Sequence, residues 1–510
     1  MNFQFTISLP EVFFILLGVS LLSGLLMFFP KVPLWYIRIH IGVISLPPIT
    51  ALLALITERE NKIFGPWHLD SLAWLMAVFV LTIGFVVQKY SVRYLLGDDS
   101  YRKYFSLLTL TTVADTAAWL SDDLHWLLAG WGITLLGLTW LLKLNKQWDV
   151  AKNAGVYAGR MFAISWLLLL TASLWITQTT GQWQISQVLT ADSLAQFTDL
   201  EKTSITLLLI LSVMIPAGQF PFHRWLLDSV VAPTPVSAVM HAGIVNAGGI
   251  LLTRFAPLFS GGFTQFILLA FTIVSVIIGT GIMLVQADYK RQLVGSTIAQ
   301  MGFMLIQIAL QAYLAAIIHA VLHGLFKSTL FLQAGSVLSH KNPMFKPENR
   351  PSFFLTIIGG SLGVLVGIGF WLTAPQEGYQ LVSSVILALS VSIAWTQLVA
   401  FGTGRISRVV GIAVLVITAT VYGLIHTAFN RLLHGTIQIA IQPPGFVTVL
   451  ILIILLGSTA FGAWLARNRS STAFGVIYLW LVHFGEPHQN LVESHPKHLA
   501  KMMSRGGQSH

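Results

Sequence analysis

Long apolar runs, separated by short polar breaks, follow one another along the 510-residue chain. Many are about 20 residues long, which is enough for a helix to cross the ~30 Å hydrocarbon core of a bilayer. The alternating ten-residue segments that are typical of membrane barrels do not occur. The pattern therefore predicts an all-α, polytopic membrane protein. We expect about 15 spans, near residues 10–29, 34–57, 71–88, 104–121, 123–142, 157–177, 203–222, 237–255, 264–286, 292–311, 313–338, 352–374, 381–402, 408–425 and 445–466.

One predicted span contains helix-breaking residues. The run "ILSVMIPAGQFPFHRW" places Pro216 and Gly218 in its middle. Proline removes a backbone donor and clashes with the preceding turn, so a broken or kinked helix is expected here. Broken helices at membrane depth often border transport sites, although a simple packing kink is at least as common.

The C-terminal 44 residues, 467–510, differ in character from the rest of the chain. They are polar and histidine-rich, and their one apolar stretch is "AFGVIYLWLVHF" at 473–484. We therefore divide the chain into a transmembrane domain, 1–466, with its core at roughly 65–402, and a cytoplasmic tail. The tail is expected to begin with a short amphipathic helix.

Composition and charge support a membrane protein. Hydrophobic residues make up 55% of the chain and charged residues only 9%, against ~25% charged residues in soluble proteins. The net charge of +10 raises the question of nucleic-acid binding. If the N-terminus is outside, however, 21 of the 29 Lys and Arg residues fall in inside loops and the tail, and five in outside loops. This asymmetry predicts a multi-pass inner-membrane protein with a cytoplasmic C-terminus and no nucleic-acid partner.

The missing residue types exclude several functions. The chain has no cysteine, which excludes disulfides, thiolate zinc sites, iron–sulfur clusters and cysteine nucleophiles within it. No glycine-rich phosphate loop is present. No paired carboxylates or serine nucleophile motif point to catalysis, so we expect a transporter subunit and not an enzyme.

The strongest candidate for chemistry is the stretch "AAIIHAVLHGLFKSTLFLQAG" (315–335), which contains His319, His323 and Lys327. Their four-residue spacing places all three on one helix face. A charged side chain near the bilayer centre costs ~2.5 kcal/mol or more, so such residues face a bundle interior or water. Histidine titrates near neutral pH and lysine responds readily to desolvation, which suits a proton relay. A single histidine is more often structural, but three ionisable groups on one face favour the relay.

Other polar residues lie in or beside the spans. His241 and Asn246 share one span, and Asp115 lies in another, where a carboxylate needs a cation or a proton. We include His241 and Asp115 in the predicted relay. Secondary candidates are Asp228, Lys290, Arg160 and Asn246, although Lys290 is explained most simply as a topology anchor.

Three segments resemble a known superfamily. They are "RWLLDSVVAPTPVSAVMHAG" (224–243), "ADYKRQLVGSTIAQMGFM" (287–304) and "HGLFKSTLFLQAGSV" (323–337). They are similar to the proton-translocating, antiporter-like subunits of respiratory complex I and of Mrp antiporters, and residues 69–108 resemble the large subunit-5 branch. The resemblance covers roughly residues 65–340. It implies two inverted five-helix repeats, each with a broken helix. It matches Lys327 and its upstream histidines to the lysine helix of the second repeat, and His241 to the histidine of the central axis.

Three features of the family pattern are missing here. That branch usually reads Gly-Trp-Glu in its fifth span, whereas Gly132 occupies the acidic position in this sequence. The first broken helix usually carries a lysine three residues before Gln-x-Pro, and this position is Pro216. The region "APQEGYQLVSSVILALSVSIAWTQ" also lacks the lysine expected near the second break. The resemblance thus implies that the first half-channel has lost its acid/base pair while the central relay is retained.

The chain is also too short for the long lateral helix of the complex I subunit. A short chain of this branch looks like the DabB family, the membrane subunits of bacterial two-component inorganic-carbon pumps. That resemblance implies a cytoplasmic, zinc-dependent, carbonic-anhydrase-like partner (DabA-like) that would hold the zinc, with no cofactor in this chain.

Our leading hypothesis is thus a proton-coupled, or sodium-coupled, membrane subunit that powers conversion of CO2 to bicarbonate by its partner. The alternative is a subunit of an Mrp-type cation/proton antiporter or of a complex I-like or hydrogenase proton pump. A third reading is a structural anchor whose relay is vestigial.

Overall fold

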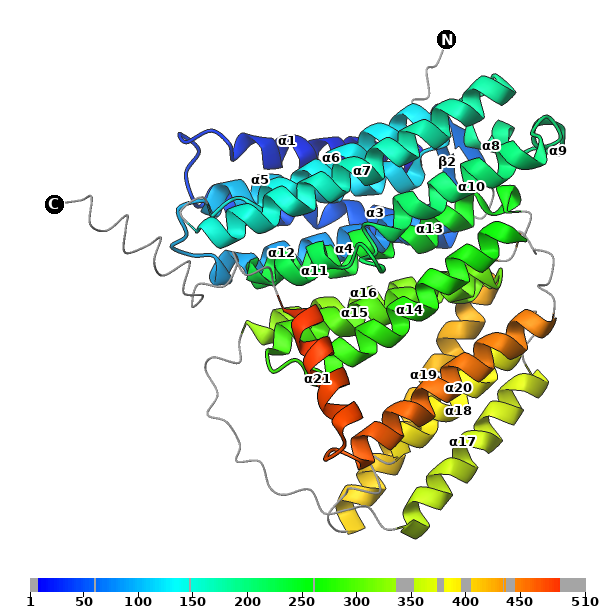
Figure 1. The fold of residues 1–510 in the computed structure, drawn as a ribbon. Helices are drawn as coiled ribbons and strands as arrows, with labels where there is room; N and C mark the ends of the chain where they lie inside the picture. Colours follow the sequence, from blue (N-terminus) through cyan, green and yellow to red (C-terminus); the bar gives the residue numbers. More distant parts are fainter. Residues whose placement is uncertain are drawn as a thin grey trace. The chain divides into compact units, whose positions relative to one another are not determined.

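The computed structural model describes residues 8–58, 61–145, 148–259, 262–335, 353–373, 380–395, 405–433, 435–436 and 445–486. It is almost entirely helical, as predicted (Figure 1). Each of the 15 expected spans overlaps a helix or two consecutive helices. Eleven helical stretches within the described residues are long and apolar enough to cross a membrane.

The described residues form two compact units. Unit 1 lies within residues 1–306, 319–338 and 475–510, and unit 2 within 307–318 and 339–474. The helices up to the first break are α1 (Leu9–Leu26), α2 (Tyr36–Ile44), α3 (Leu46–Thr57), α4 (Ser71–Tyr94), α5 (Tyr101–Leu120), α6 (Leu124–Leu142), α7 (Asp149–Thr180), α8 (Ile185–Val188), α9 (Ala191–Leu194) and α10 (Asp199–Met214). Those after it are α11 (Arg224–Asp228), α12 (Thr234–Ala242), α13 (Ala247–Arg254), α14 (Phe263–Val285), α15 (Tyr289–Ala309), α16 (Tyr313–Ala334), α17 (Phe353–Thr373), α18 (Gln380–Trp395), α19 (Arg405–Leu433), α20 (Gly445–Arg467) and α21 (Thr472–Gly485).

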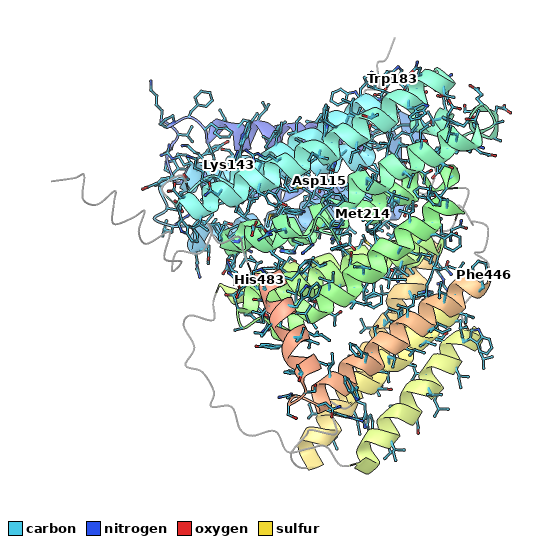
Figure 2. All side chains as sticks on the ribbon, viewed as in Figure 1. Asp115, Lys143, Trp183, Met214, Phe446 and His483 are labelled. Carbon is cyan, nitrogen blue, oxygen red and sulfur yellow. The ribbon has the colours of Figure 1, made fainter. Side chains whose placement is uncertain are left out.

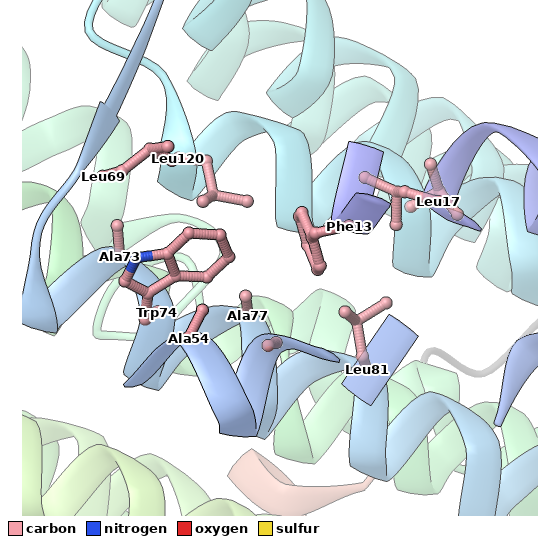
Figure 3. Close-up of a cluster of buried hydrophobic side chains, with 11 residues drawn as sticks. Phe13, Leu17, Ala54, Leu69, Ala73, Trp74, Ala77, Leu81 and Leu120 are labelled. Carbon is pink, nitrogen blue, oxygen red and sulfur yellow. The ribbon is translucent and has the colours of Figure 1, made fainter. Parts of the chain in front are cut away.

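The first helices of unit 1 pack around an apolar cluster (Figure 3). Phe13 from α1 meets Trp74 from α4 edge to face, with ring centroids 5.1 Å apart. Small residues such as Ala54 and Ala77 let the helices approach. On the outer faces, by contrast, large apolar side chains such as Leu22 and Leu284 are 63% and 74% exposed. Such exposure is unfavourable in water and suits contact with lipid.

Glycines bring α5 and α6 into close contact. A Cβ at Gly130 would lie 2.8 Å from the carbonyl oxygen of Ala114, and one at Gly137 would lie 2.5 Å from the Thr111 hydroxyl. Only hydrogen fits at these positions, which is the usual device for close helix packing in membranes. This contact holds the Asp115 segment of α5 firmly against α6.

The predicted break after α10 is present. Pro216 and Gly218 follow the end of the helix, Gly218 has a positive φ of 61°, and the helix resumes only at α11. The Trp225 indole donates a 2.6 Å hydrogen bond to the Ile215 carbonyl, which satisfies a backbone acceptor freed by the break. The Gln219 amide donates to the Ile298 carbonyl of α15, so protein surrounds this irregular backbone as a membrane requires.

A second interruption was not predicted. The span expected at 237–255 consists of α12, a 3-10 turn over Ile244–Asn246, and α13. Gly243, with φ −101° and ψ −84°, separates α12 from the turn. The break therefore lies directly after His241. The family resemblance implies a second break near "APQEGYQLVSSVILALSVSIAWTQ" (374–397). Residues 380–395 of this stretch form the helix α18, and the others lie outside the described residues.

A short hairpin precedes α4. Its strands β1 (Lys62–Phe64) and β2 (Trp67–Leu69) pair antiparallel, with Ile63 opposite His68. In unit 2, α18 contacts α17, α19 and α20. The helix expected at 473–484 corresponds to α21, which packs against unit 1.

Candidate ion-relay site

Lys327 on α16 is the most deeply buried cationic side chain of the predicted site. It is 1% exposed, and its Nζ donates a 2.8 Å hydrogen bond to the Leu293 carbonyl of α15. That carbonyl is its only hydrogen-bond partner among the described residues, so no carboxylate there is paired with it. A lysine with a neutral partner can lose its proton without leaving an unpaired buried anion, which an ion-paired lysine cannot do.

Helix α16 packs directly on the interrupted α12–α13 segment. A Cβ at Gly324 would lie 2.8 Å from the Ala242 carbonyl and 3.1 Å from the Asn246 amide nitrogen. The His241 ring stacks on Phe331 of α16, with centroids 4.3 Å apart. His241 and Asn246 are both buried, at 1% and 0% exposed. The structure therefore brings the predicted residues of the two helices into one interface.

His323 lies in this interface, one turn before Lys327. Neither of its ring nitrogens has a hydrogen-bond partner within the described part of the chain, and the same holds for Nδ1 of His241. The His319 and His323 ring centroids are 6.2 Å apart. Buried polar atoms without partners are costly and need an explanation, such as a functional role or bound water. Water molecules between these nitrogens would complete a path for a proton.

Asp115 lies on the other side of the same interruption, inside the helices of unit 1 (Figure 2). Its Oδ2 would be 3.5 Å from a Cβ at Gly243. Its Oδ1 has no hydrogen-bond partner among the described residues. It borders a cavity of about 20 Å³, together with Thr112, Thr134 and Gly243, which is room for about one water molecule. The break after His241 therefore has Asp115 on one side and α16 on the other.

The position of the lost acid is filled. A Cβ at Gly132 would lie 2.8 Å from Nε1 of Trp166 on α7. That indole donates a 2.9 Å hydrogen bond to the Leu128 carbonyl. The space in which a carboxylate at this position would begin is thus occupied by a tryptophan held by its own hydrogen bond.

Of the four secondary candidates, Asn246 lies in the interface described above and the other three lie elsewhere. The Lys290 Nζ donates to the Ala232 carbonyl at 3.0 Å and borders a separate cavity of about 460 Å³, together with Asp98 and Asn145. Asp228 is buried in the short helix α11, and Arg160 is exposed on α7. None of these three borders the Asp115 cavity.

A further set of polar residues, absent from our sequence predictions, lies where α4 begins and α13 ends. Asp70 accepts a 2.7 Å hydrogen bond from the Ala73 amide and so caps α4. Both of its oxygens also pair with the Arg254 guanidinium. Burial opposes ionisation of Asp70, but Arg254 outweighs that effect and holds the pKa of the carboxyl below its usual value. The signal in the sequence was weak because Arg254 resembles an ordinary charged residue at the end of a span.

A second missed network joins α1, α2, α4 and α5. The His40 ring lies within 2.9 Å of both Ser23 and Thr109 hydroxyls and 3.2 Å from Gln88. Both ring nitrogens are satisfied, in contrast to those of His323. This network therefore has the features of a structural connection between helices.

Within the described residues, no group of three or more His, Cys, Asp or Glu side chains is placed to hold a metal ion. A helical bundle with interrupted helices that enclose buried ionisable groups belongs to the class of polytopic membrane transporters.

Sequence comparisons identify the family. The family described as "NADH:quinone oxidoreductase/Mrp antiporter, TM" matches residues 121–411, and the complex I chain 5 N-terminal family matches residues 65–105. The chain therefore belongs to the NADH:quinone oxidoreductase/Mrp antiporter family.

Full-length relatives are more specific. The chain is 54% identical over 497 residues, covering 98% of both sequences, to the "probable inorganic carbon transporter subunit DabB" of Bacillus subtilis. It is 53% identical over 98% of both sequences to the Bacillus anthracis protein of the same description. These comparisons confirm the predicted resemblance. A solved Mrp complex from Dietzia sp. contains a chain of the same fold, with a TM-score of 0.65 at 22% identity over 98% of this chain and 59% of that one.

Proposed function

We propose that this chain is the ion-translocating membrane subunit of an inorganic-carbon transporter, and that the ion is a proton carried by the relay site. The observation that carries the proposal is Lys327, which is buried, bonded to a carbonyl and placed one turn from His323. The description of the DabB relatives supports carbon as the cargo.

In this proposal the proton passes between side chains that can gain or lose a proton. Lys327, His323 and His241 meet at the α12–α16 interface, and Asp115 lies beyond the Gly243 break. Because Trp166 fills the site beside Gly132, the proton would depend on this central set and not on a separate acid/base pair in the first repeat. Chain movement at the break would connect or separate Asp115 and His241.

The partner in this proposal is a cytoplasmic, zinc-dependent, carbonic-anhydrase-like subunit of the DabA type. Conversion of CO2 and water to bicarbonate releases one proton. Ion flow through the membrane subunit would drive that conversion forward, with the zinc chemistry entirely in the partner. In this arrangement the N-terminus is outside and the basic loops and C-terminus face the cytoplasm of the inner membrane.

The test uses cells that depend on the two-subunit complex for bicarbonate uptake. We expect Lys327→Ala and His323→Ala each to abolish uptake while the complex still co-purifies. The matched control is Lys103→Ala, which removes an exposed lysine at the start of α5 and is expected to leave uptake unchanged. An uncoupler should abolish wild-type uptake.

Two outcomes would contradict the proposal. Full uptake in either relay variant would remove that residue from the mechanism. Rescue of sodium-sensitive cells, with no carbon uptake, would identify a cation/proton antiporter instead.

A further inference from the structure

His68 lies between two buried carboxylates at the end of unit 1 where α4 begins. Its Nε2 is 3.9 Å from Oδ2 of Asp70, and its Nδ1 is 3.8 Å from Oδ1 of Asp122. The His68 side chain is 25% exposed, whereas those of Asp70 and Asp122 are 2% and 1% exposed. The His68 imidazole is therefore in contact with solvent on one side and lies beside two buried carboxylates on the other.

The backbone fixes this position. His68 pairs with Ile63 in the hairpin. The Asp122 amide donates a 2.8 Å hydrogen bond to the Pro66 carbonyl, and Trp67 forms a β-bridge with Ser121. The hairpin is thus joined to the turn between α5 and α6 through Pro66 and Trp67, the two residues directly before His68, which places the His68 backbone beside this turn.

The cluster of Asp70, Arg254, Asp122 and His68 has an unbalanced negative charge when His68 is neutral. The charge of Asp70 is balanced by Arg254. Asp122 accepts hydrogen bonds from the Ser186 amide at 2.9 Å and the Ser186 hydroxyl at 2.7 Å, both of which are neutral. With a neutral His68 the cluster carries one net negative charge, and with a protonated His68 it carries none. Burial of an unbalanced charge is costly, so the cluster favours one added positive charge.

Two further ion pairs lie near the cluster among the described residues. Asp123 in the α5–α6 turn lies 3.0 Å from His125, and Glu58 lies 2.7 Å from Lys62 in the hairpin. His125 is 60% exposed, so its pair with Asp123 is in contact with water. Among the described residues, His68 is therefore the one cation-forming side chain within ion-pair distance of Asp122.

The cluster touches the ends of the relay helices. Asp122 follows the end of α5 and lies seven residues after Asp115. Arg254 is the last residue of α13, which continues from the interruption beside His241. A change of charge on His68 acts directly on Asp122 and, through Asp70, on Arg254.

We propose that His68, together with Asp70 and Asp122, is a proton-binding site at this end of unit 1. Binding of a proton there would control the movement of ions through the protein by acting on helices α5 and α13. The expected topology places this end on the outer side of the membrane, where the site responds to external pH. The control of ion movement rests on the proposed function, whereas the binding of the proton does not.

The first experiment measures proton binding without any transport assay. The full chain in lipid nanodiscs is treated with diethyl pyrocarbonate, which reacts with neutral imidazoles, at a series of pH values. Mass spectrometry then reads each histidine separately. In Asp122→Asn, His68 should react faster than in the wild type at the same pH, because removal of the nearby negative charge disfavours the protonated, unreactive ring.

His125 is the internal control in the same samples. Asp122→Asn should leave its reaction rate unchanged, and Asp123→Asn should raise the rate of His125 but not that of His68. An unchanged rate for His68 in Asp122→Asn, or equal changes in both histidines, would overturn the proton-binding site.

The second experiment tests control of ion movement in proteoliposomes, and it uses His68 itself because Asp122 is buried. His68→Lys fixes the positive charge and His68→Gln fixes the neutral state. Wild-type ion flux should approach that of His68→Lys at low external pH and that of His68→Gln at high external pH, and both variants should lose the pH dependence. His125→Gln should retain it.

The outcomes are distinguishable. Wild-type pH dependence in both His68 variants would overturn the control of ion movement by this site. If the wild-type chain moves no ions, the proposed function fails, while the modification experiment still decides whether His68 binds the proton.

Discussion

At the scale of single residues, the Trp166 side chain occupies the space that a side chain at position 132 would need. Its Nε1 approaches the Cβ position of Gly132 to 2.8 Å and is itself hydrogen-bonded to the Leu128 carbonyl. A carboxylate cannot be restored at position 132 by one substitution, because the indole already fills the space.

We therefore predict that Gly132→Glu destabilises the protein and does not create a new relay group. The indole must move and lose its hydrogen bond, at a cost of about 1–3 kcal/mol. The melting temperature in detergent should fall by several degrees. The double variant Gly132→Glu/Trp166→Ala should lose less stability than the sum of the losses in the two single variants. Simple additivity would show that the two residues do not compete for space.

Residue spacing predicted which residues share a face in the candidate site, but it could not predict how they contact other helices. Four-residue spacing was sufficient to place His319, His323 and Lys327 on one helix, since it follows from helix geometry alone. The partner of Lys327 is a backbone carbonyl, which every residue has, so the sequence contains no signal for Leu293. The approach of Asp115 to Gly243 depends on how α5 meets α12, which spacing within one helix does not determine.

At the scale of elements, the break after α10 could be predicted from the sequence, whereas the break between α12 and α13 could not. Pro216 removes a backbone donor, and the break after α10 was predicted from it. The turn over Ile244–Asn246 contains no proline, and Gly243 alone is a common residue in membrane helices. Each predicted apolar run overlaps at least one helix, and eleven helical stretches among the described residues qualify as spans, because length and hydropathy are local properties. The hairpin at 62–69 was missed because its strands have only three residues each.

The link between α4 and α13 gives a prediction at this scale. Asp70→Asn leaves the Arg254 guanidinium without its anion, and breaking a buried pair from one side costs about 3 kcal/mol. The melting temperature should therefore fall clearly at neutral pH, and the variant Asp123→Asn, which alters an aspartate with greater exposure, should change it less.

The same pair has a predictable pH dependence. The pKa of Asp70 is lowered in the folded state, so its stabilisation is complete above the unfolded value of about 4 and is lost as the pH falls below it. The difference in melting temperature between wild type and Asp70→Asn should therefore shrink between about pH 4 and pH 2. A difference that stays constant over this range would contradict the assignment of the stabilisation to the ionised carboxylate.

At the scale of the whole molecule, the C-terminal helix α21 contacts the segment between α10 and α11, where the first helix break lies. Phe484 of α21 stacks on His223, with centroids 4.7 Å apart, and the Phe220 and Phe484 rings are 6.4 Å apart. The Gln286 amide, just after α14, donates to the Val482 carbonyl at 3.5 Å. The tail helix was expected from its apolar residues, but its contact with residues some 260 positions earlier could not be expected from any local pattern.

We predict that Phe484→Ala loosens the segment between α10 and α11. Loss of the stacked pair removes about 1 kcal/mol, so amide hydrogen exchange in the 215–223 segment should become severalfold faster. Val476→Ala, a change at a 62% exposed position of the same helix, is the control and should leave that exchange rate unaltered. Equal exchange in both variants would show that α21 does not support the break.

The placement of α21 also has a consequence for biosynthesis. Unit 1 is assembled from three stretches of the chain, and the last of them begins only at residue 475. During synthesis, some 260 residues are made between His223 and Phe484, so the segment around His223 is made before its stacking partner exists. In a nascent chain that stops before α21, this segment therefore lacks the Phe484 contact.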